Sequence, residues 1–534
     1  MKKKHLRVIA LALVLCLLLT GCSPLDTLQN LISYYSMRNT AFRNMEYIRP
    51  DLDKMEAALD TCAHLAQNTQ DVEELMDGVY DFYQEYDLFS TSYALADIHF
   101  NCDITDEYWK AEYAFCTEAE PAVDAMLEQL YCDLADSPLR SELERDDLFG
   151  SGFFDDYEDD PVLNKKLVKL LEQEAALENQ YYDLADRYDP KDFTENDSVY
   201  LQAAELYVEL IRIRQEIALY LGYSHYQELA YDIYYSRDYY PAEAERYMEN
   251  IAQALYEPYV SLANATIWEE AYEHCSENDT YRYLKQAAEA MGGTVEEAFS
   301  LLDHNDLYDI TYSENKMDTS FETYIWNYSA PFVFVNPYLD HTDKLTFAHE
   351  FGHFAADYAC NGTFVSTDIA EVHSQTMEYL TLCHGRDTQM LTRYKLADSL
   401  CTYMEQAAFS LFEHQVYDLR GDDLTPENVE NLYKRVGTQF GFDVPDWNPR
   451  EYVAILHLYT EPMYMISYVV SNDLAMQFYQ MELEEPYSGL ELYEESLISQ
   501  ESYILTFARD YGLKSPFDSA RLEELRVLFE IIDF

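Results

Sequence analysis

Residues 345–354 read Leu-Thr-Phe-Ala-His-Glu-Phe-Gly-His-Phe, and this stretch decides the interpretation of the whole chain. Within it, His349-Glu350-Phe351-Gly352-His353 is an HExxH pattern. On a helix, residues four apart share a face, so both imidazoles can reach one metal ion while Glu350 faces a water molecule beside it. Two imidazole nitrogens, one carboxylate oxygen and an open position suit zinc. The pattern therefore predicts a helical site that holds one Zn²⁺ per chain.

The residues on either side fit such a helix. Phe332-Val333-Phe334-Val335 is a β-prone run between prolines 331 and 337, and alternating aromatic residues precede it, so we expect a small sheet over residues 309–337. The HExxH helix should follow that sheet directly, from Asp343 to about Cys360. Gly352 lies inside it, although glycine costs about 1 kcal/mol relative to alanine in a helix. We therefore expect another backbone to approach closely there.

The rest of the 534-residue chain favours helices. Only 15 glycines and 16 prolines interrupt it, and few breakers are typical of long helices. Helices are expected over residues 23–135, 165–188 and 199–275, and again from 368 to the end. Pro241 is at a position where a new helix can begin. An acidic loop is expected over 136–161 and a polar loop over 189–198. The fold class is mostly α, with the small sheet beside the HExxH helix.

A catalytic zinc site needs a third protein ligand. Glu371, His373 and Glu378 all follow His353 within one stretch that reads as a buried helix. Spacing alone leaves all three open.

The N-terminus predicts export. Lys2, Lys3, Lys4 and Arg7 precede an apolar run, Val8–Leu19, that is too short to span a membrane in the ordinary way. It ends in Leu19-Thr20-Gly21-Cys22, which resembles a bacterial lipoprotein signal. The sequence therefore predicts a signal peptide over residues 1–21 and a lipid on Cys22. The mature protein would be anchored to a bacterial membrane at the cell envelope and would face outside the cytoplasm.

Charge and cysteine content limit the partners. The formal net charge is −65, so nucleic acid and anionic membrane would be repelled, and we expect no nucleic-acid binding. No CxxC spacing occurs, so a thiolate zinc site is not expected. Eight cysteines remain beyond Cys22, and either disulfides or buried free thiols are possible in an exported protein.

The stretch after His353 resembles the thimet oligopeptidase and oligoendopeptidase F family of zinc peptidases. In that family HEFGH is followed by a helix reading Glu-x-x-Ser-x-x-x-Glu, which Glu371, Ser374 and Glu378 match. The resemblance implies that Glu371 is the third zinc ligand and that Glu378 orients a ligand histidine, as outer partners of zinc sites commonly do. A histidine at the position of His373 occurs in one branch of the family. The segment between His353 and Glu371 is shorter than is usual.

Two stretches upstream carry the same resemblance. Arg214-Gln215-Glu216-Ile217-Ala218, with Leu221-Gly222-Tyr223 and Tyr226 after it, resembles the helix before the catalytic region. Residues 330–336, Ala-Pro-Phe-Val-Phe-Val-Asn, resemble the edge strand ahead of HExxH. An edge strand can pair with an extended peptide, so Ala330 and Phe332 are expected to bind substrate.

Downstream, residues 457–468 resemble the family's His/Tyr substrate segment. His457, Tyr464 and Tyr468 match its histidine and two of its tyrosines, whereas Ile466 stands where many members have another tyrosine. The resemblance implies Glu350 as general base, zinc with Tyr464 or Tyr468 at the oxyanion, and His457 as a further donor that also contacts substrate.

The resemblance covers roughly residues 200–480. It implies a large helical zincin-type peptidase with a deep central channel that admits short peptides. The expected domains are the signal peptide over 1–21, an N-terminal helical region over 22–198 and a zinc peptidase region over 199–534. The expected activity is endopeptidase cleavage of short oligopeptides. A dipeptidase or carboxypeptidase of another HExxH-plus-Glu family is an alternative, as is a catalytically silent, lipid-anchored peptide-binding protein. The oligomeric state is not indicated.

Overall fold

The structure is a computed structural model that describes residues 38–145, 148–157, 162–185, 197–363, 365–444, 447–499 and 501–532. The predicted signal peptide and Cys22 lie outside these residues, as does most of the polar loop predicted over 189–198. The chain divides into two compact units. The N-terminal unit runs to Lys169 and includes His304–Leu307 and Tyr324–Ala330, and the main unit contains the remainder. This division falls at residues 169 and 170, earlier than the boundary expected at 198.

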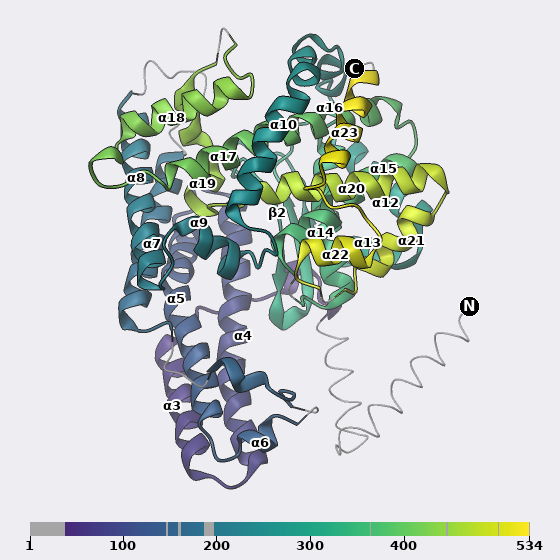
Figure 1. The fold of residues 1–534 in the computed structure, drawn as a ribbon. Helices are drawn as coiled ribbons and strands as arrows, with labels where there is room; N and C mark the ends of the chain where they lie inside the picture. The colour runs from purple at the N-terminus through teal and green to yellow at the C-terminus, as the bar shows by residue number, and fades with distance from the viewer. Residues whose placement is uncertain are drawn as a thin grey trace, which may run out of the picture. The chain divides into compact units, whose positions relative to one another are not determined.

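The N-terminal unit is built from three long helices, coloured purple to blue in Figure 1. They are α3 (Leu52–Asn68), α4 (Val72–Cys102) and α5 (Glu107–Ala135). An aspartate caps each one by accepting a hydrogen bond from a backbone N–H of the first turn: Asp51, Asp71 and Asp106. Of the helices predicted over residues 23–135, those from Leu52 on are confirmed, and residues 23–37 lie outside the described part.

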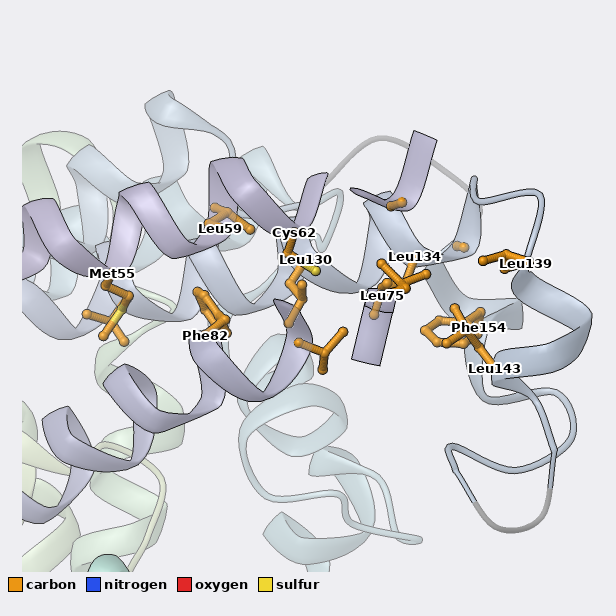
Figure 2. Packing of buried hydrophobic residues seen from close by; sticks show 14 of the residues in the cluster. Met55, Leu59, Cys62, Leu75, Phe82, Leu130, Leu134, Leu139, Leu143 and Phe154 are labelled. Carbon is orange, nitrogen blue, oxygen red and sulfur yellow. The ribbon is translucent and has the colours of Figure 1, made fainter. Parts of the chain in front are cut away.

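The core of this unit follows from helical spacing. On α3 the buried residues are Met55, Leu59, Cys62 and Ala66, which recur every three or four positions and so share one face. Figure 2 shows three of these packed with side chains such as Phe82 of α4. Beyond α5, the predicted acidic loop contains a one-turn helix, α6 (Arg140–Leu143), and a 3₁₀ segment, η2 (Phe153–Tyr157). Residues 146, 147 and 158–161 of that loop lie outside the described part.

Helices also dominate the main unit. In chain order its first half contains α7 (Lys165–Ala185, which begins in the N-terminal unit), α8 (Asp197–Tyr220), α9 (Tyr226–Leu229), the π-helix η3 (Ala230–Tyr234), α10 (Pro241–Ser261), η4 (Leu262–Asn264), α11 (Ile267–Ala271), α12 (Glu277–Met291) and α13 (Gly293–His304). Helix α10 begins at Pro241, as predicted.

The second half of the main unit continues the helical pattern around the catalytic region. It contains α14 (Asp343–Cys360), α15 (Thr367–His384), α16 (Gln389–Cys401), the π-helix η6 (Thr402–Gln406), α17 (Ala407–Val416), η7 (Gly421–Asp423), α18 (Pro426–Gln439), η8 (Pro449–Ala454), α19 (Leu456–Thr460), α20 (Ile466–Glu484), α21 (Ser488–Ser496), α22 (Ile504–Asp510) and α23 (Ser519–Ile531). No described helix is both long enough and apolar enough to cross a bilayer.

The predicted small sheet is present between α13 and α14. It contains β1 (Tyr308–Asp309), β2 (Ser320–Ile325) and β3 (Ala330–Val335), and a short 3₁₀ segment, η5 (Trp326–Tyr328), joins β2 to β3. The strand order is β1-β3-β2, and β1 runs parallel to β3 with Tyr308 opposite Val333.

One prediction about this sheet is wrong. Residues 330–336 were expected to form an edge strand, but β3 is the central strand and all six of its residues are buried. Ala330 and Phe332 are 0% and 1% exposed. Because β3 lies between β1 and β2, it is not an edge strand; the binding of substrate by Ala330 and Phe332 stays a prediction.

The sheet leads into the helix that carries the HExxH pattern. Between β3 and α14, the buried carboxylate of Asp343 accepts hydrogen bonds from the backbone N–H groups of Tyr338 (2.9 Å) and Asp340 (3.2 Å). This bonding stabilises the turn that directs the chain into α14. Helix α15 packs against α14 on one side and α20 on another. These three helices supply most of the candidate site.

Candidate metal centre and active site

Two turns of α14 and one of α15 bring three metal-binding side chains together. Glu371 Oε2 lies 3.3 Å from His349 Nε2, and Glu371 Oε1 lies 3.9 Å from His353 Nε2. The donor atoms of all three residues lie within 4.8 Å of one another. Among the described residues, this is the one such group of histidine, cysteine or acidic side chains found. Two imidazoles and a carboxylate at this spacing fit the three protein ligands of a catalytic zinc site.

The pKa of each of these three residues is shifted by the charge of at least one of the other two. Glu371 is 1% exposed; burial opposes its charge, but the two histidines outweigh burial and lower its pKa to about 2. Burial also disfavours charge on His349, yet Glu371 and Glu378 raise its pKa. At His353 burial dominates and lowers the pKa to about 4. A neutral imidazole and an ionised carboxylate are the forms that bind a metal.

The spacing of α14 and α15 depends on Gly352. A Cβ atom at this position would lie 2.5 Å from the Cα of Ser374 and 2.9 Å from the carbonyl oxygen of His373. Both are backbone atoms of α15, which confirms the close approach predicted from the glycine. Ser374 also donates a hydrogen bond of 2.9 Å to Glu371 Oε2, which orients the ligand carboxylate.

Glu378 contacts the ring nitrogen of His349 that faces away from the metal-ligand cluster. Its Oε1 lies 2.9 Å from His349 Nδ1, and its Oε2 lies 2.7 Å from the ammonium group of Lys395 on α16. Lys395 in turn lies 3.3 Å from Asp398. Burial opposes charge on Glu378, but Lys395 and His349 outweigh it and lower its pKa. An ionised partner on Nδ1 leaves Nε2 of His349 free to face the ligand cluster.

Glu350 faces the start of β2. The hydroxyl of Ser320 donates a 2.7 Å hydrogen bond to Glu350 Oε1. The side chain is 5% exposed, and burial raises its pKa to about 7, against the opposing charge of His349. A carboxyl whose pKa lies near neutrality is suited to accept and return a proton.

The His/Tyr segment lies against the third ligand. The hydroxyl of Tyr464 donates a hydrogen bond to Glu371 Oε1, and the hydroxyl of Tyr468 lies 3.2 Å from His457 Nε2. The two tyrosine rings have centroids 5.1 Å apart. The structure therefore groups all three residues singled out in this segment, and Tyr464 is the one that bonds directly to the metal-ligand cluster.

A buried arginine anchors the first part of the segment. Arg214, on α8, is fully buried and donates hydrogen bonds to the carbonyl oxygens of Leu458 (3.1 Å) and Tyr459. Its Nε also bonds Glu174 at 2.5 Å, and its Nη2 also bonds Glu178 at 2.8 Å; both glutamates lie on α7. The carbonyls directly after His457 are thus bound to a charge held by α7 and α8.

A second buried arginine anchors the other end. Arg237 donates hydrogen bonds to the carbonyl oxygen of Met463 (2.9 Å) and to the hydroxyl of Ser467 (2.8 Å). It also lies 3.3 Å from Asp368, in the first turn of α15. Met463 has a φ of +69°, an unusual backbone conformation for a residue other than glycine. Arg237 therefore joins the His/Tyr segment to the helix that carries Glu371.

His373, one of the three open candidates, points away from this cluster. Its ring packs edge-on against Tyr493 and Phe507, with centroids 6.1 and 6.2 Å away. It is 1% exposed, and burial lowers its pKa to about 3. His373 is thus a neutral core residue, whereas Glu371 is grouped with His349 and His353 and Glu378 contacts His349.

Several residues of the site were not identified from the sequence. Lys395, Asp398, Ser320 and Arg237 have no motif of their own. The eight cysteines other than Cys16 and Cys22 are all free thiols, which decides the alternative left open by the sequence.

Comparisons with known proteins agree with this architecture. A family model described as the Peptidase M3 N-terminal domain matches residues 42–160. No curated protein shows significant sequence similarity to the chain.

Solved structures match across most of the chain. PZ peptidase A with inhibitor 2 is 22% identical with a TM-score of 0.78, covering 92% of this chain and 99% of that one. A Bacillus anthracis strain Ames protein provisionally named oligoendopeptidase F is also 22% identical, with a TM-score of 0.75 and the same coverage. Oligoendopeptidase-F from Enterococcus faecium is 16% identical with a TM-score of 0.56, covering 89% and 95%.

At these identities the solved structures establish the fold. The chain has the helical fold of the oligoendopeptidase F structures, with the small sheet beside the HExxH helix, and the resemblance inferred from the sequence is confirmed. The family model and the fold together support a peptidase.

Proposed function

We propose that this protein is a zinc-dependent endopeptidase that hydrolyses short oligopeptides at the cell envelope. The observation that carries the proposal is the grouping of His349, His353 and Glu371, with donor atoms within 4.8 Å of one another. Glu350 adjoins this group on α14, and Tyr464 bonds to its carboxylate. A protein that only bound peptides would have no need of a general base at this place.

The donor set fits zinc. The buried carboxylate of Glu371 is oriented by Ser374, and His349 is oriented by Glu378, as zinc ligands usually are. Bound zinc would polarise the scissile carbonyl and lower the pKa of its water to about 7.

Glu350 then acts as general base and general acid. It takes the proton from the attacking water and passes it to the leaving nitrogen. Its hydrogen bond from Ser320 holds one carboxylate oxygen toward β2, so that the other oxygen is available for the proton. A pKa near 7 lets the same group accept the proton and release it.

Tyr468 is the residue that we assign to the oxyanion. The phenol of Tyr464 donates its hydrogen bond to Glu371 Oε1, whereas that of Tyr468 contacts the half-buried His457 and the hydroxyl of Tyr464, and within the described residues it bonds none of the three metal-binding side chains. A phenol donor at this place would stabilise the tetrahedral oxyanion by a hydrogen bond. His457 keeps the Tyr468 hydroxyl in place and can itself donate to substrate.

Substrate would pair with β2 and not with β3. Because the strand order is β1-β3-β2, β2 is an outer strand of the described sheet. Its first residue, Ser320, is bonded to Glu350. An extended peptide added along residues 320–323 would therefore run past the general base by backbone pairing.

The location of the protein is also part of the proposal. The lipoprotein-like signal that ends at Cys22 supports anchoring to a bacterial membrane through a lipid on that residue. Labelling of Cys22 with a lipid precursor, and its loss in Cys22→Ala, would test this part separately from the enzymatic activity.

The activity is tested with a pool of quenched peptides of graded length, comparing wild type with Glu350→Gln, each before and after removal and return of zinc. We expect zinc-restorable internal cleavage of short peptides, and a loss of roughly 10²–10⁴-fold in the variant, which retains zinc. Release of single residues or dipeptides from one end would indicate a dipeptidase or carboxypeptidase. Zinc binding at one per chain without any cleavage would indicate a silent peptide-binding protein.

A further inference from the structure

A cavity in the main unit shares none of its lining residues with the metal-ligand cluster or the residues that hold it. We call it the aromatic pocket. It has a volume of about 400 Å³ and is formed by the C-terminal end of α10, α11, the junction of α16 with η6, α17, α18, the segment after α18, and η8. Cavities of this size hold small organic ligands.

Aromatic side chains form much of the wall of the aromatic pocket. Trp268, Trp447, Tyr433 and Phe442 all line it. The centroid of Trp447 lies 5.9 Å from that of Tyr433 and 6.1 Å from that of Phe442. Trp268 is fixed by a 3.0 Å hydrogen bond from its indole N–H to the carbonyl oxygen of Leu262. These rings are therefore held in position before any ligand arrives.

A carboxylate also lines the aromatic pocket. Glu405 lines the pocket and accepts a 3.0 Å hydrogen bond from the hydroxyl of Tyr259. The thiol of Cys401 is its other hydrogen-bond donor. Both donors are uncharged, and within the described ranges no lysine, arginine or histidine forms an ion pair with Glu405. A second carboxylate, Glu451, also lines the pocket.

Glu405 is presented by an unusual turn. It lies in the π-helix η6, which interrupts the continuous helical run formed by α16, η6 and α17. Such single π-turns are frequent at functional sites.

We propose that the aromatic pocket is a binding site for an organic cation with an apolar body, such as a substituted ammonium or a guanidinium compound. Aromatic faces attract cations through the negative potential of their rings, and the attraction strengthens as water is excluded. Glu405 can supply the compensating negative charge at short range: burial raises the pKa of its carboxyl, and a cation bound beside it would favour the ionised form. A neutral apolar ligand would leave that carboxylate buried and uncompensated, which is unfavourable.

A bare metal ion does not fit the same features. Hard cations take six or more oxygen ligands, and zinc takes three or four protein ligands. The described residues group three such ligands only at His349, His353 and Glu371. The aromatic pocket offers two carboxylates, and its remaining surface is largely aromatic.

The test uses benzyltrimethylammonium as the cation and neopentylbenzene, which has the same shape without the charge, as its neutral counterpart. Isothermal titration calorimetry on the metal-free protein measures both, so that the result does not depend on peptidase activity. We expect the cation to bind at least tenfold more tightly than the neutral compound. Trp268 and Trp447 are two of only four tryptophans in the chain, so binding should also change the intrinsic fluorescence.

Variants then locate the site. Glu405→Gln should weaken binding of the cation at least tenfold. Glu524→Gln, which removes the same charge from a partly exposed side chain of α23, should leave the affinity unchanged, and thermal unfolding checks that both variants are folded. Acetyl-arginine amide, measured in parallel, distinguishes a basic peptide side chain from a free ammonium compound as the source of the cation. Equal binding of the neutral compound, an unchanged affinity in Glu405→Gln, or no binding of either cation at millimolar concentration would overturn the proposal.

Discussion

Substituting Gly352 with alanine tests whether the contact between α14 and α15 sets the geometry of the metal site. The new Cβ would lie 2.5 Å from Ser374 Cα, and ordinary van der Waals contact begins at 3.4 Å. The two helices must therefore separate or slide by about 0.9 Å at this point. Both neighbouring atoms belong to backbone, so no side chain can rotate away to relieve the clash.

The displacement reaches the ligands directly. Glu371 lies three residues before Ser374 on α15, and His353 is adjacent to Gly352 on α14, so a shift between the helices moves the carboxylate relative to both imidazoles. Metal–ligand distances tolerate changes of only about 0.2 Å. We expect zinc affinity to fall at least tenfold, or about 1.4 kcal/mol. Overpacking costs about 1–3 kcal/mol, and alanine regains about 1 kcal/mol of helix propensity, so the stability of the metal-free protein should change by only about 0–2 kcal/mol.

Competition against a chromophoric chelator measures the zinc affinity, and chemical unfolding of the metal-free protein measures stability. Gly78→Ala is the matched control, because Gly78 also lies inside a helix and its nearest neighbour is the flexible end of Leu65, at 2.8 Å. The control should bind zinc as the wild type does. A Gly352→Ala protein with wild-type zinc affinity would refute the argument that this contact sets the spacing of the ligands.

Three further substitutions probe other parts of the site. Glu378→Gln should lower zinc affinity by roughly 10–100-fold in the same competition assay, because His349 loses its ionised partner; an unchanged affinity would contradict this role. Tyr468→Phe should lower kcat by roughly 10²–10³-fold with a smaller effect on KM in steady-state peptide cleavage; an equal loss confined to Tyr464→Phe would move the oxyanion role to Tyr464. Burial raises the pKa of Glu413 to about 8 from 4.5, so the folded protein retains a proton that the unfolded chain releases, and Glu413 destabilises the fold increasingly as the pH rises from about 5 to 8. The gain in unfolding free energy from Glu413→Gln should therefore grow by up to about 1.4 kcal/mol per pH unit in urea titrations at pH 5.5 and 7.5, and an equal gain at both would show that Glu413 is ionised in the fold.

The local part of the site was predictable because it follows from helix geometry. His349 and His353 share a face at any four-residue spacing, and Gly352 is unfavourable in a helix unless something requires it. The identity of the third metal ligand, among Glu371, His373 and Glu378, could not be predicted in this way. It depends on how α15 is rotated about its own axis, which spacing does not contain, and only the resemblance selected Glu371 before the structure placed His373 in an aromatic core.

The order of strands was not predictable from the same run of residues. Phe332-Val333-Phe334-Val335 is apolar at every position, and an alternating pattern would have been expected of a half-exposed edge strand. The uninterrupted run is typical of a strand covered on both faces, and all six residues of β3 are in fact buried. The edge position was expected from the resemblance, and this one expectation was wrong because β3 lies between β1 and β2. The first residue of β2, Ser320, is polar and gives little indication of a strand.

The least predictable contacts are those of the buried arginines, and they explain how an acidic chain with 35 basic and 100 acidic residues maintains its site. The segment around Met463 has a backbone conformation that its own residues do not favour. Arg214 binds carbonyl oxygens before it and Arg237 binds the carbonyl of Met463 itself. A buried guanidinium needs several acceptors to offset its desolvation, and an irregular segment has carbonyls that no helix uses. Each requirement therefore satisfies the other, and the position of Tyr464 and Tyr468 is set by α8 and by the segment after η3, more than 200 residues earlier in the chain.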